Sequence, residues 1–225
     1  MKKTPFLEAG FDIRETFWSE TIAQLNHTYD GLGLGIDPNI LETVAGCIVH
    51  GFTTRQSCGG HLELKKLRYP WIDIIAPNEP KIEFIHEREA LLRAANRSGV
   101  HPDKLFQSDI GDDAFWKELA LLNPDYERTP EYDQWLNECA IAQGDLAVFL
   151  EIYQKESPPF PLPMPFITDG SLATVPRNEI NSLARQPLSK IDARQITRRI
   201  QESQASMERF GSWMKERFFR QGAFR

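Results

Sequence analysis

Cysteine is scarce in this sequence. Its 225 residues include only three, Cys47, Cys58 and Cys139. A small, odd number of cysteines argues against a framework of disulfide bonds and favours a reducing compartment. Long apolar runs are missing as well, since no stretch approaches the roughly 20 apolar residues that a membrane-spanning helix needs. Near the N-terminus, Glu8 and Asp12 interrupt the apolar core that a signal peptide would require. We therefore expect a cytoplasmic protein without a membrane partner.

Charge of one sign does not dominate the chain. The formal net charge is -6 at pH 7, which does not indicate a nucleic-acid-binding protein as a whole. The final segment differs, because residues 186–225 carry nine Lys and Arg against four Asp and Glu. Contact of this basic segment with nucleic acid is therefore an alternative that the sequence leaves open.

Several widespread catalytic motifs are also absent. The chain contains no Gly-x-Ser-x-Gly nucleophile elbow, no Walker-type phosphate loop and no Cys-x-x-Cys pair. The sequence does not identify a cofactor either. A functional site has to be inferred from less specific patterns.

Hydrophobic periodicity predicts a helix-rich α+β fold. The longer helices are expected at 12–29, 38–50, 80–98, 132–155 and 188–220, and shorter helical pieces at 102–106 and 112–122. Residue type and alternation predict strands over Thr53–Cys58 and Tyr69–Ala76, and Asp169-Gly170 is typical of a hairpin turn. We expect a small antiparallel sheet wrapped by helices in a single domain, residues 1–185. A C-terminal amphipathic helix within residues 186–225 completes the predicted organisation.

Asp37-Pro38 marks the start of the second predicted helix. Proline is favoured at the first helical position, and an aspartate before it can accept a hydrogen bond from the N–H groups of the first turn. The sequence therefore predicts Asp37 as a capping residue.

Apolar and small residues repeat along the C-terminal helix at intervals of three and four positions. They are Ile196, Ile200, Ser203, Met207, Phe210 and Met214. This heptad-like seam predicts packing on the body of the protein or on a second copy, which would make a homodimer. The nucleic-acid alternative rests on the basic residues of the outer face, Arg194, Arg198, Arg199 and Arg209. A non-enzymatic interaction protein that works through this helix is one functional hypothesis.

The best candidate site is the turn Ser57-Cys58-Gly59-Gly60-His61, which follows the first predicted strand. Two adjacent glycines allow left-handed backbone angles and let a ligand approach main-chain amides, which can hold an anion. Cys58 is a candidate nucleophile and His61 a candidate base, so these two are the expected catalytic residues.

Neighbouring positions supply candidate ligand-binding residues. By alternation, Arg55 and Ser57 share one face of the first strand, which would place Arg55 as a clamp for an anion. Trp71 and Asp73 share a face of the second strand, where Asp73 could orient a histidine or a substrate group. The predicted ligand-binding set is Arg55, Ser57, Gly59, Gly60, Trp71 and Asp73. The expected ligand is a small molecule or a nucleotide, and the reaction stays open.

The residues Thr54, Ser57, Cys58, Gly60, His61 and Leu62 precede a strand with Pro70-Trp71. This pattern resembles the Ser-Cys-x-Gly-His signature of a loose group of uncharacterised bacterial and phage proteins. It is more distantly similar to the Ser-Ser-Cys-Ser-Gly-Arg-Ile motif of the wybutosine-synthesis methyltransferase family, which acts on tRNA with S-adenosylmethionine. Cys58 and Gly60 match that motif, and His61 stands where the family has arginine. The resemblance covers about ten of the 225 residues and implies only that such a turn can lie at a site related to RNA or nucleotides.

Cysteine and histidine also recur in a pattern that could bind zinc. Cys47-x-x-His50 and Cys58-x-x-His61 supply four ligands, enough for a tetrahedral structural site. At 100° per residue, Cys47 and His50 fall on the outward side of the helix at 38–50, away from its apolar stripe. A zinc-stabilised module is therefore a further hypothesis. It requires the first strand to fold back over that outward side.

Overall fold

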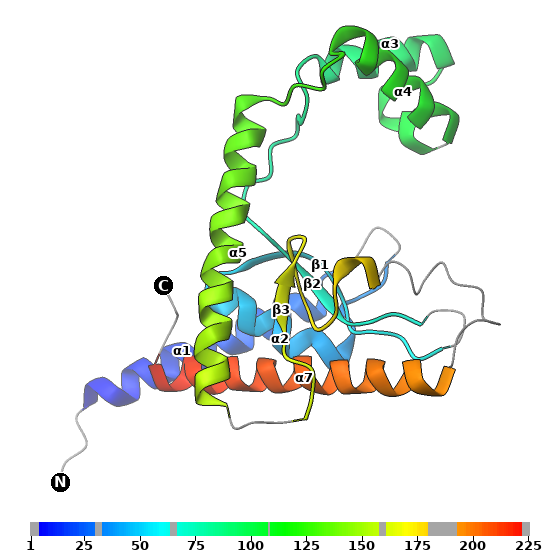
Figure 1. Cartoon of the computed structure of the whole chain (residues 1–225). Coiled ribbons are helices and arrows are strands. Elements are labelled where there is room, and N and C mark those ends of the chain that lie inside the picture. Colours follow the sequence, from blue (N-terminus) through cyan, green and yellow to red (C-terminus); the bar gives the residue numbers. More distant parts are fainter. Residues whose placement is uncertain are drawn as a thin grey trace. The chain divides into compact units, whose positions relative to one another are not determined.

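The predicted fold class is confirmed. The computed structural model describes residues 5–29, 33–63, 67–107, 109–157, 161–179 and 193–221, and its ribbon is a helix-rich α+β arrangement (Figure 1). The helices are α1 (Pro5–Asn26), α2 (Pro38–Val49), α3 (Glu87–Ser98), the 3-10 helix η1 (Pro102–Gln107), α4 (Asp109–Leu122), α5 (Pro130–Glu156) and α7 (Ala193–Gln221). The strands are β1 (Thr53–Cys58), β2 (Trp71–Ile75), β3 (Phe166–Thr168) and β4 (Ser171–Ala173).

Contacts divide the chain into two compact units. Unit 1 comprises Met1–Ile75 with Cys139–Arg225, and unit 2 comprises Ala76–Glu138. Helix α5 contributes residues to both units. The C-terminal helix α7 belongs to unit 1. Residues 180–192, around the predicted division between residues 185 and 186, lie outside the described residues.

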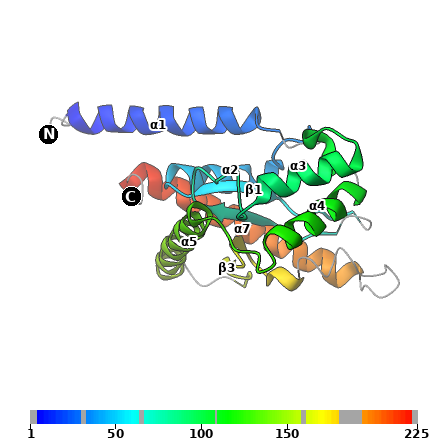
Figure 2. The ribbon, with the colours of Figure 1, turned by 90° about the horizontal axis from the view of Figure 1, so that it is seen from above.

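The four strands form one antiparallel sheet in the order β1-β2-β4-β3. Strands β3 and β4 make the hairpin that Asp169-Gly170 predicts, with φ angles of 44° and 78° at these two residues. One face of the sheet packs into the main core through Ile72, Ile74 and Leu172. The same core contains buried residues of α2, α5 and α7, and both views show α2 and α7 beside the strands (Figures 1 and 2).

The second face of the sheet carries a smaller cluster of buried residues: Cys58, Leu67, Tyr69, Trp71, Ala173, Val175 and Ile200. Trp71 alternates with Ile72 along β2, so the two side chains point to opposite faces. The candidate residues Cys58 and Trp71 therefore lie away from the main core, on the sheet's second face.

Helices α2 and α7 cross at very short range. A Cβ atom added to Gly211 would lie 2.6 Å from Thr43 Oγ1 and 2.9 Å from the Thr43 backbone nitrogen. On α2, a Cβ atom added to Gly46 would lie 2.8 Å from Met214 Cε. Thr43 Oγ1 also donates a hydrogen bond of 2.9 Å to the Met207 carbonyl oxygen, deep in the core. Two glycines at the crossing thus allow the backbones to approach closely.

The seam predicted along α7 is buried within unit 1. Ile200, Ser203, Met207, Phe210 and Met214 are all buried, and Ile196 packs against the smaller cluster. At the other end of α7, Phe218 contacts Trp18 of α1, with ring centroids 6.4 Å apart. The helix therefore packs on the body of the protein, which was one of the two expected arrangements. The structure holds one chain, so a homodimer stays a prediction.

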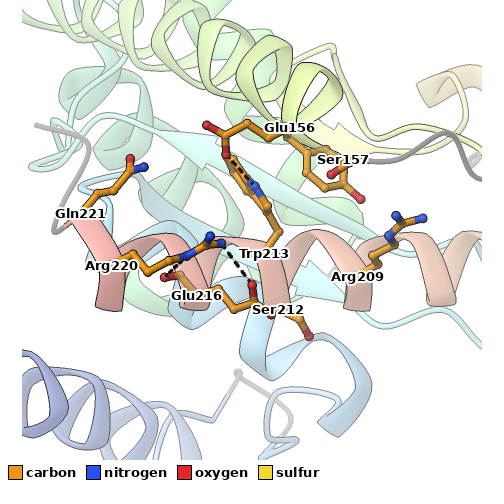
Figure 3. A pocket seen from close by; sticks show the side chains of 9 residues that line it. Glu156, Ser157, Arg209, Ser212, Trp213, Glu216, Arg220 and Gln221 are labelled. Carbon is orange, nitrogen blue, oxygen red and sulfur yellow. Dashed lines mark hydrogen bonds and ion pairs between the residues drawn. The ribbon is translucent and has the colours of Figure 1, made fainter.

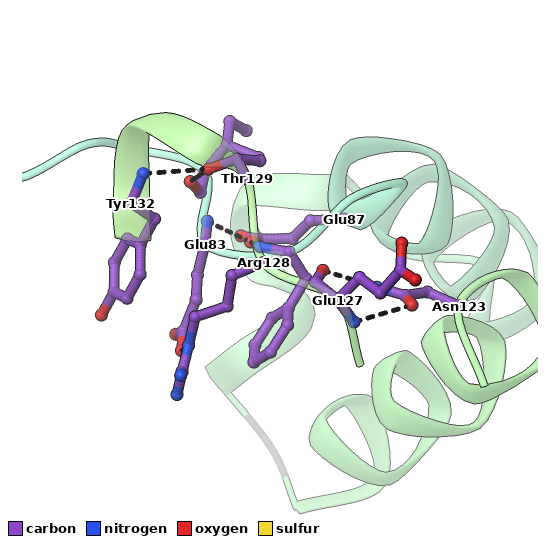
Figure 4. Close-up of polar contacts among 9 residues, drawn as sticks. Glu83, Glu87, Asn123, Glu127, Arg128, Thr129 and Tyr132 are labelled. Carbon is purple, nitrogen blue, oxygen red and sulfur yellow. Dashed lines mark hydrogen bonds and ion pairs between the residues drawn. The ribbon is translucent and has the colours of Figure 1, made fainter. Parts of the chain in front are cut away.

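Two helix starts differ most from the predictions. Helix α1 begins at Pro5 rather than at residue 12. Helix α3 begins at Glu87 rather than at residue 80, because the residues before it have other hydrogen-bond partners (Figure 4). The Glu87 carboxylate accepts the backbone N–H groups of Glu83 and Phe84, at 2.6 and 2.9 Å. Phe84 in turn forms a β-bridge with Arg128.

Unit 2 packs α3, η1 and α4 around Leu105 and Leu119, which are fully buried. Asn123, at the end of α4, holds two separate loops together (Figure 4). Its amide nitrogen donates to the carbonyl oxygens of Ile85 and Glu127, and its amide oxygen accepts the Glu127 N–H. None of the predicted site residues belongs to this unit.

Within the described part of the chain, no helix combines the length and the apolar character that a membrane crossing requires.

The close crossing of α2 and α7 predicts opposite effects for two Gly→Ala substitutions. Gly211→Ala should lower the free energy of unfolding by about 1–3 kcal/mol, because its new methyl group meets Thr43 backbone atoms that cannot move independently. Gly144→Ala, in the exposed middle of α5 with nothing within 4 Å, should raise it by about 0.5–1 kcal/mol through helix propensity. Urea unfolding of both variants measures the two changes. Equal effects of both substitutions would contradict the close crossing.

Candidate functional site

The turn after β1 is held by side chains from two helices. Asp37, directly before α2, accepts the Gly59 N–H through Oδ2 at 2.7 Å. Asn39 of α2 donates to the Gly59 carbonyl oxygen at 2.6 Å. From α7, the Gln204 amide donates to the carbonyl oxygens of Gly59 and Gly60, both at 3.0 Å. The polar groups of this turn are thus satisfied from both sides, which fixes its conformation.

Both glycines of the turn are required by geometry. A Cβ atom on Gly59 would lie 2.0 Å from Asn39 Oδ1 and 2.7 Å from Asp37 Cβ. Gly60 has a φ angle of 83°, and a Cβ atom there would lie 3.0 Å from the Arg68 carbonyl oxygen. The expectation of left-handed backbone at this pair is confirmed for Gly60. Gly59 is needed for a different reason, the close approach of two neighbouring side chains.

The turn brings three potential metal ligands together. One ligand atom each of Asp37, Cys58 and His61 lies within 4.8 Å of the other two. Among the described residues, this is the one such group of three or more. His61 is fixed by its backbone, which exchanges two hydrogen bonds with Arg68, at 2.9 and 3.1 Å. Cys58 is fixed at the end of β1, opposite Trp71.

The predicted zinc set of Cys47, His50, Cys58 and His61 is not brought together. Cys47 and His50 are fully buried in the main core, so their predicted outward position on α2 is wrong. The prediction was wrong because the side of α2 that carries His50 faces α7 and the Phe149 ring of α5 rather than solvent. His50 Nε2 lies 3.0 Å from the Met214 carbonyl oxygen, and its ring contacts Phe149.

The pKa shifts of Cys47 and His50 are those of buried core residues. Burial raises the pKa of the Cys47 thiol to about 12. Burial also lowers the pKa of His50, against the opposing effect of the Met214 carbonyl. Both side chains are therefore neutral at pH 7 and pack as core residues.

Cys58 carries a protonated thiol in this environment. Burial raises the pKa of Cys58, and the nearby Asp37 carboxylate adds to the increase. The Gly60 N–H, which hydrogen-bonds to the sulfur, and the Arg68 guanidinium lower the pKa without cancelling the effect of burial. Because the thiolate is the nucleophile, the protein alone does not activate Cys58.

Three of the predicted ligand-binding residues, Arg55, Trp71 and Asp73, form a cluster on the second face of the sheet. The Asp73 carboxylate accepts the Ser171 hydroxyl at 2.6 Å and an Arg177 N–H at 3.3 Å. Arg55 approaches the same carboxylate at 3.9 Å. The Arg177 guanidinium lies over the Trp71 ring, 4.8 Å from its centroid. Asp73 thus orients two arginines rather than a histidine.

Ser57 lies apart from this cluster. It pairs with Ile72, so it lies on the face opposite to Asp73. The face predicted to be shared by Arg55 and Ser57 is interrupted by a β-bulge between Thr54 and Ser57. Strict alternation could not reveal this extra residue in the strand.

The sequence did not indicate that Asp37 would contact the turn, and it gave no role to Asn39, Gln204, Ser171 or Arg177. Asp37 stands at the capping position, as predicted, but makes no side-chain capping bond because its carboxylate is turned to Gly59. The Asp37-Pro38 pair was the available signal, and it indicated a helix start alone. Gln204, Ser171 and Arg177 are separated from the turn by more than 100 positions, and no local pattern points to them.

A hollow lies elsewhere on unit 1, between the end of α5 and α7 (Figure 3). It is lined by Tyr153, Glu156, Ser157, Arg209, Ser212, Trp213, Glu216, Arg220 and Gln221. Its charged groups pair with their neighbours, since Glu156 accepts Trp213 Nε1 at 3.1 Å and Arg220 pairs with Glu216. None of the predicted site residues lines this hollow, so it does not form part of the candidate site.

No protein-family model, curated protein or solved structure matches this chain. The candidate site therefore has to be judged from its own geometry.

The protonated state of Cys58 predicts slow alkylation in the folded protein. Chelator-treated protein at pH 8 should react with iodoacetamide at Cys58 at least about ten times more slowly than the urea-denatured chain. Both the raised pKa and the burial of the sulfur act in this direction. Peptide mapping by mass spectrometry follows each cysteine separately. Rapid modification of Cys58 in the folded state would show an activated thiolate and contradict this account.

Proposed function

We propose that the Cys58–His61 turn and the adjoining face of the sheet bind a small molecule with an acidic group, a phosphate or a carboxylate. Nucleotides belong to this class. The observation that carries the proposal is the convergence of Arg55 and Arg177 on the single carboxylate of Asp73. These arginines lie on the face of the sheet that also carries Cys58 and Trp71.

The charges of the cluster favour an anion. Two guanidinium groups approach the Asp73 carboxylate, Arg55 at 3.9 Å and Arg177 at 3.3 Å. Asp73 is buried, whereas the side chains of Arg55 and Arg177 are 46% and 28% exposed. A ligand can therefore reach the two arginines from the solvent side while the buried Asp73 carboxylate pairs with them. The planar fork of arginine matches the geometry of carboxylate and phosphate groups.

The cluster is also preorganised. Arg177 stacks on Trp71 and donates to Ser171 Oγ at 2.7 Å, so its side chain has already lost much of its rotational freedom. A group that is fixed before binding loses less entropy when the ligand arrives. The rigid turn at Gly59 and Gly60 has the same property, because side chains from two helices hold it.

The proposal is one of binding and does not extend to thiolate catalysis. The pKa of Cys58 is raised by burial and by Asp37, which disfavours attack by this thiol in the absence of another cation. His61 stays a candidate base, since it lies half-buried at the edge of the turn.

The competing hypothesis of an interaction protein has less support from the geometry. The apolar seam of α7 is used within unit 1. Its basic face is partly neutralised by neighbours, since Arg198 pairs with Glu202 at 2.8 Å and Arg199 pairs with Glu179 at 2.5 Å. Binding of nucleic acid through this helix would have to compete with these ion pairs.

Calorimetric titration with inorganic phosphate, citrate, AMP and ATP tests the proposed function. The wild type should bind at least one of these probes, and Arg177→Gln and Arg55→Gln should each weaken that binding by about tenfold or more. Each substitution removes charged hydrogen-bond donors and leaves Asp73 with its other partners. Arg93→Gln is the matched control, because this exposed arginine of unit 2 pairs with Glu89.

Circular dichroism of each variant establishes that the fold is retained. Failure of all four probes to bind the wild type would refute the proposal. Equal affinity of the two site variants and the wild type would refute it as well.

A further inference from the structure

We propose that Asp37, Cys58 and His61 bind a single transition-metal ion of the zinc class, with one coordination position left open. The site concerns the same turn as the proposed function but does not rest on it, because metal binding can be measured without any anionic ligand. The inference starts from the proximity of the three ligand atoms, all within 4.8 Å of one another.

The separations are close to those of a tetrahedral centre. Zinc bonds of about 2.0–2.3 Å at tetrahedral angles place the ligand atoms roughly 3.3–3.6 Å apart. The three side chains therefore need to close by about 1 Å, which small rotations of χ angles can supply.

The donor set selects the class of metal. Asp37 offers oxygen, Cys58 sulfur and His61 nitrogen. Magnesium and calcium prefer oxygen ligands throughout, whereas zinc is bound by all three of these residue types. A soft sulfur donor beside an imidazole thus indicates zinc or a neighbouring divalent transition metal.

Each ligand is fixed by a contact outside the metal position. The Gly59 N–H holds the Asp37 carboxylate through Oδ2, which leaves the second oxygen for the metal. The Gly60 N–H holds the Cys58 sulfur, and the paired backbone of Arg68 holds His61. Such supporting hydrogen bonds orient metal ligands and raise affinity. Within the described residues, no hydrogen bond or ion pair engages the His61 ring, and one ring nitrogen lies within 4.8 Å of the other two ligand atoms.

Three protein ligands leave a fourth position for water or for a ligand atom. Structural zinc sites have four protein ligands, and sites with three keep an open position. No fourth His, Cys, Asp or Glu of the described residues joins this group, and Cys47 and His50 lie in the main core. The site is therefore suited to binding a reactant rather than to stabilising the fold. An acidic group of the proposed ligand could occupy the open position.

The test is cobalt and zinc binding by full-length protein purified without a polyhistidine tag. After chelator treatment, the wild type should take up one Co²⁺ per chain and show a sulfur-to-cobalt charge-transfer band that zinc abolishes by displacement. Cys58→Ser should lose the band. Asp37→Asn and His61→Gln should each weaken cobalt binding by more than about 100-fold, beyond the 10- to 100-fold effect typical of supporting residues.

The matched controls are Cys139→Ser, His101→Asn and Asp103→Asn, which change the same residue types outside the turn. His101 and Asp103 are exposed in unit 2, and Cys139 is a buried residue of α5. All three should bind cobalt as the wild type does. A band that persists in Cys58→Ser, or no stoichiometric binding by the wild type at micromolar concentration, would overturn the proposal.

The Arg177→Gln variant distinguishes the metal site from the proposed site for an acidic ligand. Arg177→Gln should keep full cobalt binding, because Arg177 is not a ligand. Loss of cobalt binding in this variant, with the fold intact, would overturn the assignment of the metal to Asp37, Cys58 and His61. If Cys58→Ser fails to fold, His61→Gln decides, since its ring lies at the edge of the turn and outside both hydrophobic clusters. Cobalt affinity equal to that of the wild type in a folded His61→Gln variant would likewise refute the site.

Discussion

The close crossing of α2 and α7 is the constraint on which the candidate site depends. Gly46 and Gly211 let the two helices approach until side-chain and backbone atoms touch, and the Thr43–Met207 hydrogen bond joins them. This crossing places the start of α2 and the middle of α7 on either side of one turn. The carbonyl oxygens of Gly59 and Gly60 then meet donors from both helices. A change in the helix packing would therefore move the groups that hold Cys58 and His61.

Asp37 shows how a local role in the fold can give way to a tertiary one. The side chain of a residue before a helix ordinarily accepts a hydrogen bond from a backbone N–H group of the first turn. This hydrogen bond stabilises the helix by roughly 1 kcal/mol. Here Pro38 has no N–H, which removes one of the unsatisfied donors at the start of α2. The carboxylate is free to bond to Gly59, and it adds negative charge beside Cys58. In the proposed metal site this charge would be compensated by the ion.

The two faces of the sheet have different roles. Ile72, Ile74 and Leu172 stabilise unit 1 through burial in the main core. The opposite face holds Trp71 and Asp73 beside the turn, with arginines from two separate segments. A cation site and two guanidinium groups near one face of the sheet would together suit a ligand with an acidic group. Unit 2 has its own core around Leu105 and Leu119 and contributes none of these residues.

The sequence by itself determined the elements and the location of the turn. Periodicity identified the strand Thr53–Cys58, the long terminal helix and a strand at Tyr69–Ala76 that contains the observed β2, because these patterns depend on neighbouring residues. The two glycines likewise indicated a special backbone. Only the tertiary structure decided which histidine and cysteine lie close together, since Cys47 and His50 proved to be buried rather than exposed to solvent. The β-bulge and the contacts of Gln204 and Arg177 also depend on segments that are distant in the sequence. Such contacts produce no periodic pattern of residues, so the sequence alone does not indicate them.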